Sequence, residues 1–236
     1  MKFIWAVATH TGMVRDSNQD SVFPGAGGAG MGPLLLVVAD GMGGHAGGEV
    51  ASRIAIETVT EAHAGSIEER IVEANARIAA AGKDDPAVAG MGTTVSMVEI
   101  SPEGMAEIGH VGDSRVYLLR DGVLRQITLD HTLVAQWVAD GRLTEQEAAV
   151  HPQRSMLMRA VGHGRPLEVD VIEEPLVAND RLMICSDGLS VMVDDITITN
   201  LLSKGTPEEA VWSLVEAANR AGGHDNITVV AVDVEP

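Results

Sequence analysis

The sequence predicts a domain of the α+β class, in which helices cover the outer faces of antiparallel sheets. Apolar segments typical of strands occur in groups along the chain, and the helical segments fall in blocks between those groups. Repeated parallel βαβ units would instead alternate a strand with a helix throughout. In addition, Asp121-Gly122 separates two apolar segments and suits the two-residue turn that joins antiparallel strands.

Segments rich in Val, Ile and Leu predict the strands. They comprise residues 3–9, 34–39, 93–100, 105–111, 115–120, 123–128, 181–185 and 227–234. The glycine-rich stretch GAGGAGMG at residues 25–32 predicts a flexible surface loop within the domain.

The helices are indicated by capping residues followed by apolar residues at helical spacing. Ser66 and Glu69 form a possible capping box ahead of a helix that Gly82 is placed to end, and Thr206-Pro207 begins another that Gly222 stops. Further helices are expected at about residues 48–64, at residues 132–140, and from Thr144 onward.

Composition limits the possible classes of protein. The chain has 236 residues, 45% of them hydrophobic, and is most simply interpreted as one catalytic domain spanning residues 1–236. A formal net charge of −18 disfavours nucleic acid and anionic membranes as partners. The first apolar run is too short for a signal peptide, and the single Cys185 fits a reducing compartment, so a cytoplasmic protein is expected.

Aspartates stand at the ends of the predicted strands, where side chains from distant segments can converge. They are Asp20, Asp40, Asp113, Asp187 and Asp225. A single aspartate at a strand end is usually a turn or cap residue, but five in this arrangement favour a shared site. If they converge, their mutual repulsion requires cations, and hard carboxylate oxygens favour Mg²⁺ or Mn²⁺.

Other metals are weaker alternatives. The candidate ligands include no His/Cys set with the spacing of zinc sites, and the spacing of a Ca²⁺-binding EF-hand is missing. Two divalent cations would lower the proton affinity of a water that bridges them and stabilise nearby negative charge, which suits a hydrolytic site.

The ordered motifs resemble those of bacterial metal-dependent protein serine/threonine phosphatases, the type 2C (PPM, PP2C-like) family. The resemblance covers essentially the whole chain, with order and spacing in agreement. The matching segments are RDSNQD (15–20), VADGMGGHAGGEVAS (38–52), GTT (92–94), GHVGDSRVYLLRDG (109–122), ITLDHTLV (127–134), HPQRSMLMRAVG (151–162), ICSDGLSVMV (184–193) and GHDNITVV (223–230).

The resemblance implies a four-layer α/β/β/α sandwich with a metal site at one end of two central antiparallel sheets. By matching position, Asp40 would bridge two Mn²⁺ or Mg²⁺ ions, and the Gly41 carbonyl would complete one coordination sphere. Asp187 and Asp225 would hold one ion, and Asp20 would contribute to the other. Asp113 with Asp187 matches the acidic pair of a possible third ion. Residues 133–162 resemble the family's flap.

Four further residues are candidates at this site. The planar guanidinium of Arg15 suits two phosphate oxygens, as its family counterpart implies, although an arginine in isolation is more often part of a surface salt bridge. Asn226 is expected to orient Asp225, and Gln19 to contact metal-bound water. Met42 stands where some relatives have a histidine. His45 is therefore a candidate general acid, with a loop role or water on the third ion as alternatives.

The resulting functional prediction is a hydrolase that dephosphorylates phosphoserine and phosphothreonine in proteins and opposes bacterial serine/threonine kinases in signalling. Its expected partners are phosphorylated proteins, including a kinase, and a monomer is the default expectation. Two alternatives remain open: a catalytically silent module that binds phosphoproteins, and a phosphatase of an anti-sigma antagonist.

Overall fold

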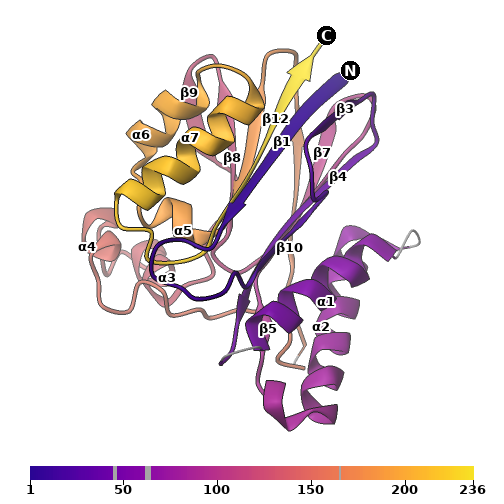
Figure 1. Ribbon diagram of the computed structural model, residues 1–236, viewed down its shortest axis with the longest axis vertical. Helices are drawn as coiled ribbons and strands as arrows, with labels where there is room; N and C mark the ends of the chain where they lie inside the picture. The colour runs from indigo at the N-terminus through magenta and orange to yellow at the C-terminus, as the bar shows by residue number, and fades with distance from the viewer. Residues whose placement is uncertain (45–46, 62–64, 165) are drawn as a thin grey trace.

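The computed structural model describes residues 1–44, 47–61, 65–164 and 166–236. Two antiparallel sheets lie face to face, and helices cover the outer face of each (Figure 1). Because apolar residues of the strands point to both faces, each sheet packs on its partner sheet on one side and on helices on the other. The predicted α+β fold with two central antiparallel sheets is confirmed.

The first sheet contains both the first and the last strand of the chain. Its spatial order is β3 (Gly28–Gly30), β1 (Lys2–His10), β12 (Ile227–Glu235), β11 (Arg181–Cys185), β8 (Arg115–Arg120) and β9 (Val123–Gln126). β1 pairs with β12 along its whole length, from Lys2 opposite Glu235 to His10 opposite Ile227. The two chain ends therefore lie side by side, at the top in Figure 1.

The second sheet carries the other strands. Its order is β10 (Asp170–Pro175), β7 (Met105–Val111), β6 (Val95–Ile100), β4 (Leu34–Met42) and β2 (Asp20–Phe23), with β5 (Gly92–Thr93) paired to the end of β4. In the register of β2 and β4, Asp20 stands opposite Asp40. This pairing brings two of the predicted site residues together at one edge of the sheet.

Helices cover both outer faces. The first sheet packs against α5 (Asp187–Ser190), α6 (Asp195–Leu202) and α7 (Pro207–Arg220), and the second against α1 (Gly47–Glu61), α2 (Ile67–Asp84) and the short 3₁₀ helix η1 (Pro86–Val88). A third apolar cluster, which includes Phe3, Leu36 and Val232, fills the space between the sheets. α3 (Leu133–Ala139) and α4 (Glu145–Ala149) belong to the flap-like segment.

The capping signals located the helices well. Ser66, Thr144 and Thr206 each form the expected capping box with the glutamate three residues later. The prediction that Gly82 ends α2 was wrong, because the helix continues to Asp84. Its end is set by Asp85, which is extended (φ −123°, ψ 107°) as expected for a residue before a proline.

The glycine-rich stretch at residues 25–32 is also more ordered than predicted. Gly28–Gly30 form β3, which pairs with Phe3–Trp5 of β1 at the sheet edge. A Cβ on Gly28 would lie 2.5 Å from the Trp5 ring, so the indole leaves room only for glycine at this point. Small residues are thus needed here by packing, which the composition alone does not reveal.

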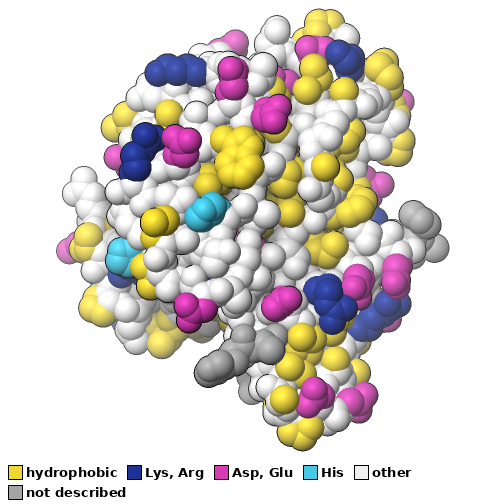
Figure 2. Space-filling view, in the orientation of Figure 1, with side chains coloured by type: hydrophobic (Ala, Val, Ile, Leu, Met, Phe, Trp, Pro, Cys, Tyr) yellow, Lys and Arg dark blue, Asp and Glu magenta, His cyan; other side chains and the backbone are white. Residues whose placement is uncertain are grey.

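The surface carries its charges in a dispersed pattern. In the view of Figure 2, Lys and Arg side chains are scattered among acidic ones. Within the described residues, no helix is both long and apolar enough to cross a membrane.

Candidate metal centre

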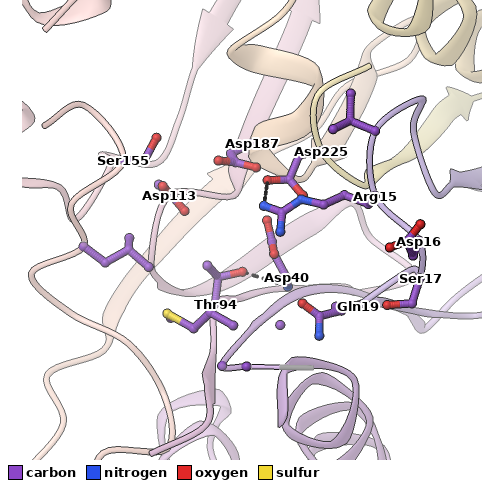
Figure 3. Close-up of a pocket in the computed structure, with 16 residues that line it drawn as sticks. Arg15, Asp16, Ser17, Gln19, Asp40, Thr94, Asp113, Ser155, Asp187 and Asp225 are labelled. Atoms are coloured by element: carbon purple, nitrogen blue, oxygen red, sulfur yellow. Dashed lines mark hydrogen bonds and ion pairs between the residues drawn. The ribbon is translucent and has the colours of Figure 1, made fainter. Parts of the chain in front are cut away.

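The predicted aspartates converge at one end of the two sheets. A cavity of about 550 Å³ opens there, and four of them line it: Asp40, Asp113, Asp187 and Asp225. Figure 3 shows their carboxylates approaching one another from different segments of the chain. Asp20 is not part of the cavity lining, but it pairs with Asp40 in the register of β2 and β4. The expected convergence of strand ends therefore occurs.

Each aspartate is placed by a strand boundary. Asp40 lies near the end of β4, Asp113 two residues after β7, Asp187 two residues after β11 as the first residue of α5, and Asp225 two residues before β12. Asp40 is fixed on both sides of its peptide, because its N–H donates to Thr94 Oγ1 (3.0 Å) and its carbonyl accepts from the Thr94 N–H (2.9 Å). The regular sheet thus sets the position of Asp40 in the carboxylate ring, the group formed by the Asp40, Asp113, Asp187 and Asp225 side chains.

Close packing of the backbone behind the ring allows only glycine at position 188. A Cβ there would lie 2.0 Å from the Asn226 carbonyl oxygen. Since that carbonyl follows Asp225 and Gly188 follows Asp187, a side chain at 188 would push two candidate ligands apart.

We therefore expect Gly188→Ala to lower the free energy of unfolding by at least about 1–3 kcal/mol, because a backbone segment must move to accommodate the methyl group. Thermal unfolding of the variant, compared with wild type, measures this. Gly25→Ala is the matched control, because a Cβ at Gly25 would meet no atom within 4 Å. Equal melting temperatures for both variants would contradict the expected crowding.

The carboxylates are held in surroundings that disfavour their charge. Burial is the largest cause of their pKa shifts. It raises the pKa of Asp20 to about 7 and that of Asp113 to about 8. Burial followed by the charge of Asp20 raises the pKa of Asp40 well above its ordinary value, and burial followed by the charge of Asp225 raises that of Asp187. Bound cations would remove this cost.

Two carboxylate oxygens supply a test of whether cations fit. Asp20 Oδ2 accepts hydrogen bonds from Ser186 Oγ (2.8 Å) and Thr228 Oγ1 (2.7 Å). Asp20 Oδ1 and Asp187 Oδ1, however, are buried and accept no hydrogen bond from the described residues. Since buried polar atoms are normally satisfied, these two hard oxygen acceptors fit a divalent cation.

The protein side chains do not form a finished ligand shell by themselves. No group of three or more His, Cys, Asp or Glu side chains in the described part of the chain is already arranged to enclose an ion. Backbone carbonyls or water must therefore complete any coordination, which is usual for Mg²⁺. Gly41 also lines the cavity, as the prediction of a carbonyl ligand requires.

Arg15 lies at the mouth of the cavity and reaches into the carboxylate ring. Its Nη2 donates to Asp225 Oδ2 at 2.7 Å (Figure 3), and its side chain is 51% exposed. The hydrogen bond and charge of Asp225 raise the pKa of the guanidinium, so Arg15 is always charged. Arg15 therefore forms a salt bridge at the site, and its role in binding phosphate stays a prediction.

Asn226 forms the expected hydrogen bond to Asp225 through its backbone, whereas its side chain binds the loop at residues 11–19. Its side chain accepts from the Gln19 N–H (2.8 Å) and donates to the carbonyls of Thr11 and Ser17 (2.9 Å each). Only its backbone N–H contacts Asp225, at Oδ1 (2.9 Å). Asn226 therefore braces the loop that carries Arg15, while the Gln19 side chain lines the cavity. The general-acid candidate His45 lies outside the described residues.

Sequence reasoning missed several residues at the site. Ser186 and Thr228, which hold Asp20, were not predicted, although each lies within a motif that also contains a predicted aspartate. Ser155 and Leu157 of the flap-like segment complete the cavity lining. No local signal in the sequence distinguishes them from packing residues.

Comparison with known proteins decides the family. The model of the family described as "Protein phosphatase 2C" matches residues 13–223. The chain belongs to the protein phosphatase 2C family. The resemblance seen in the ordered motifs is thereby confirmed.

Individual relatives within the protein phosphatase 2C family agree. The serine/threonine protein phosphatase PstP of Mycobacterium tuberculosis is 41% identical over 98% of this chain, which spans 45% of the length of PstP. The serine/threonine phosphatase stp of Listeria monocytogenes is 37% identical, with 84% of each chain covered.

Solved structures of this family have the same fold. A crystal structure of the M. tuberculosis phosphatase PstP/Ppp has a TM-score of 0.91 at 40% identity, with both chains fully covered. The PstP catalytic domain in complex with two manganese ions has a TM-score of 0.87 at 39% identity, again with both chains fully covered. The predicted fold is therefore shared along the whole chain.

Proposed function

We propose that this chain is a metal-dependent phosphatase that hydrolyses phosphoserine and phosphothreonine in proteins. The observation that carries the proposal is the convergence of the aspartates beside the exposed guanidinium of Arg15, with two buried carboxylate oxygens that accept no hydrogen bond from the described residues. Such a site combines ligands for divalent cations with a cationic group for a phosphate. The names and activities of the relatives support the same reaction.

The residues fit two Mn²⁺ or Mg²⁺ ions, with a third as a further possibility for the Asp113–Asp187 pair. Asp40 would contact both ions, Asp20 and the Gly41 carbonyl would serve one, and Asp187 with Asp225 the other. The manganese complex of the PstP catalytic domain supports this choice of metal. When bound, the ions would activate a water and neutralise charge on the phosphoryl oxygens.

The protein's own groups bind and orient the phosphate. Arg15 can exchange its hydrogen bond to Asp225 for two phosphate oxygens, because its side chain is half-exposed and its planar fork keeps its charge. The loop carrying Arg15 is held by Asn226, so the guanidinium is presented at a fixed place. His45 remains a proposal for the group that protonates the departing oxygen.

Substrate and cellular context follow as further parts of the proposal. We propose that residues 1–236 form one catalytic domain, supported by the pairing of β1 with β12. The proposal also includes a cytoplasmic monomer that opposes a serine/threonine kinase. The open cavity supports only its substrate class, because a phosphorylated segment of another protein can enter it.

The defining experiment is phosphate release from a phosphothreonine peptide and from a small aryl phosphate by chelator-treated protein. We expect release with Mn²⁺ or Mg²⁺, and almost none with Ca²⁺ or without metal, because Ca²⁺ favours longer and less regular coordination. A folded protein that binds the phosphopeptide without releasing phosphate under any of these conditions would instead be the silent binding module.

Replacing Arg15 should weaken substrate use without abolishing metal binding. We expect Arg15→Ala to lower kcat/KM by about 10- to 100-fold, the equivalent of a lost hydrogen bond between charged groups. Steady-state kinetics on the phosphopeptide measures this. Arg53→Ala is the control, because Arg53 pairs with Glu57 on the surface of α1 and does not line the cavity. An unchanged kcat/KM in Arg15→Ala would assign Arg15 to the salt bridge alone.

A further inference from the structure

His131 joins the turn that carries Asp113 to the neighbouring segments. Its backbone N–H donates to the Gly112 carbonyl (2.8 Å), and its ring Nδ1 accepts from the Gly112 N–H (3.1 Å). Gly112 immediately precedes Asp113 and has φ +117°, and a Cβ there would lie 2.5 Å from Thr94. The turn before Asp113 is thus held between Thr94 on one side and His131 on the other.

The opposite edge of the imidazole reaches the base of the flap-like segment. His131 Nε2 lies 3.1 Å from Asp170 Oδ2, and Asp170 Oδ1 accepts from Arg159 Nη1 at 2.7 Å. The His131 carbonyl accepts from the Met158 N–H (2.7 Å), and the adjoining Thr132 forms a bridge with Leu157. Since Leu157 lines the cavity, one histidine contacts both the Asp113 turn and the segment that borders the substrate space.

These contacts define which ring nitrogen carries the proton. Because the Gly112 N–H is a donor, Nδ1 must present its lone pair, and the proton then resides on Nε2, which faces the Asp170 carboxylate. The ring is only 5% exposed and packs 4.7 Å from the His110 ring. Burial lowers the pKa of His131, so the neutral form is favoured.

We propose that His131 is a positioning residue that fixes Asp113 through its Nδ1 contact with Gly112, and that this contact sets the rate of the reaction. The inference rests on the proposed phosphatase function. The role lies in one ring nitrogen: the Nδ1 acceptor positions the Asp113 turn, whereas the Nε2 contact secures the flap-like segment. Different substitutions of His131 can remove the Nδ1 contact and the Nε2 contact separately.

Asparagine and glutamine separate these two contacts. His131→Asn places an oxygen near the position of Nδ1 and keeps an acceptor for Gly112, whereas His131→Gln reaches toward Asp170 and loses that acceptor. On the phosphothreonine peptide with Mn²⁺, we expect kcat to fall about 10- to 100-fold in His131→Gln with little change in KM. In His131→Asn we expect a loss of less than about 10-fold.

A second measurement does not depend on turnover. In metal-free protein, hydrogen exchange at the Gly112 amide should be at least about 10-fold faster in His131→Gln than in wild type, and close to wild type in His131→Asn. Asp180→Asn is the control for general destabilisation, because Asp180 is buried at the Arg120 ion pair and does not line the cavity. Its kcat should match that of wild type.

Several outcomes would overturn the proposal. Equal losses of kcat in the Asn and Gln variants, a larger loss in Asn, or a loss that Asp180→Asn shares at equal stability would each assign His131 a merely structural role. If wild type releases no phosphate, the proposed function fails. The exchange rates at the Gly112 amide then test only whether His131 Nδ1 holds the turn before Asp113.

Discussion

Asp187→Asn is expected to reduce metal-dependent phosphate release by about 1,000-fold or more. The substitution removes one negative charge from the carboxylate ring and turns the carboxylate into a neutral amide. Asp187 Oδ1 is buried and accepts no hydrogen bond within the described part of the chain. Loss of a single group that stabilises a transition state can lower kcat by about 10²–10³-fold. Loss of a cation ligand weakens water activation as well as charge neutralisation. Phosphate release with saturating Mn²⁺ is the measurement.

Asp194→Asn is the matched control for this variant. Asp194 caps α6 through the Thr197 N–H, and asparagine is an equally good capping residue, so its activity should equal that of wild type. The prediction for Asp187 fails if its asparagine variant keeps more than about one tenth of wild-type activity at any Mn²⁺ concentration.

The largest effect on stability is expected from metal removal at slightly alkaline pH. The folded pKa values of Asp20 and Asp113, about 7 and about 8, exceed the ordinary value of about 3.9 in an unfolded chain. A group with a raised folded pKa binds its proton more tightly when folded, so its contribution to stability is lost as pH rises through the folded value. Without metal, stability should therefore fall by about 2 kcal/mol between pH 6.5 and pH 8.

This pH range isolates the aspartates from other titrating groups. Burial lowers the pKa of His110 to about 4. His110 therefore reduces the stability of the folded protein mainly below about pH 6.5, the ordinary pKa of histidine. The capping residues Glu147 and Glu209 have lowered pKa values and act below pH 5. Thermal unfolding in chelator at both pH values, repeated with Mn²⁺, tests the prediction. Mn²⁺ should raise the Tm more at pH 8, and a chelated Tm that rises with pH would contradict it.

Most of the sheet was predictable because its strands are buried on both faces and contain nearly continuous apolar runs. The run Arg181–Cys185 is an example: four of its five residues are buried in the structure. β10 escaped prediction because its residues alternate between partly buried and exposed and include Asp170 and two adjacent glutamates. β2 is short and begins with a predicted ligand, so its sequence resembled a turn more than a strand.

The metal centre was predictable to the level of its carboxylates and no further. Strand ends located the aspartates, but the sequence does not encode which neighbours hold them. Ser186 and Thr228 come together on Asp20 only because β11 and β12 pair, with the Ser186 N–H donating to the Thr228 carbonyl. Likewise, Asn226 was expected to contact Asp225, but the sequence did not reveal that its side-chain amide also binds three backbone groups of the loop at residues 11–19.

The central position of β12 has a consequence for synthesis on the ribosome. β12 lies between β1 and β11, so the first sheet remains split until the last nine-residue strand leaves the exit tunnel. Asp225 lies two residues before that strand, and contacts between residues more than 200 positions apart form slowly. Until β12 has left the tunnel, a nascent chain would therefore carry no complete metal centre.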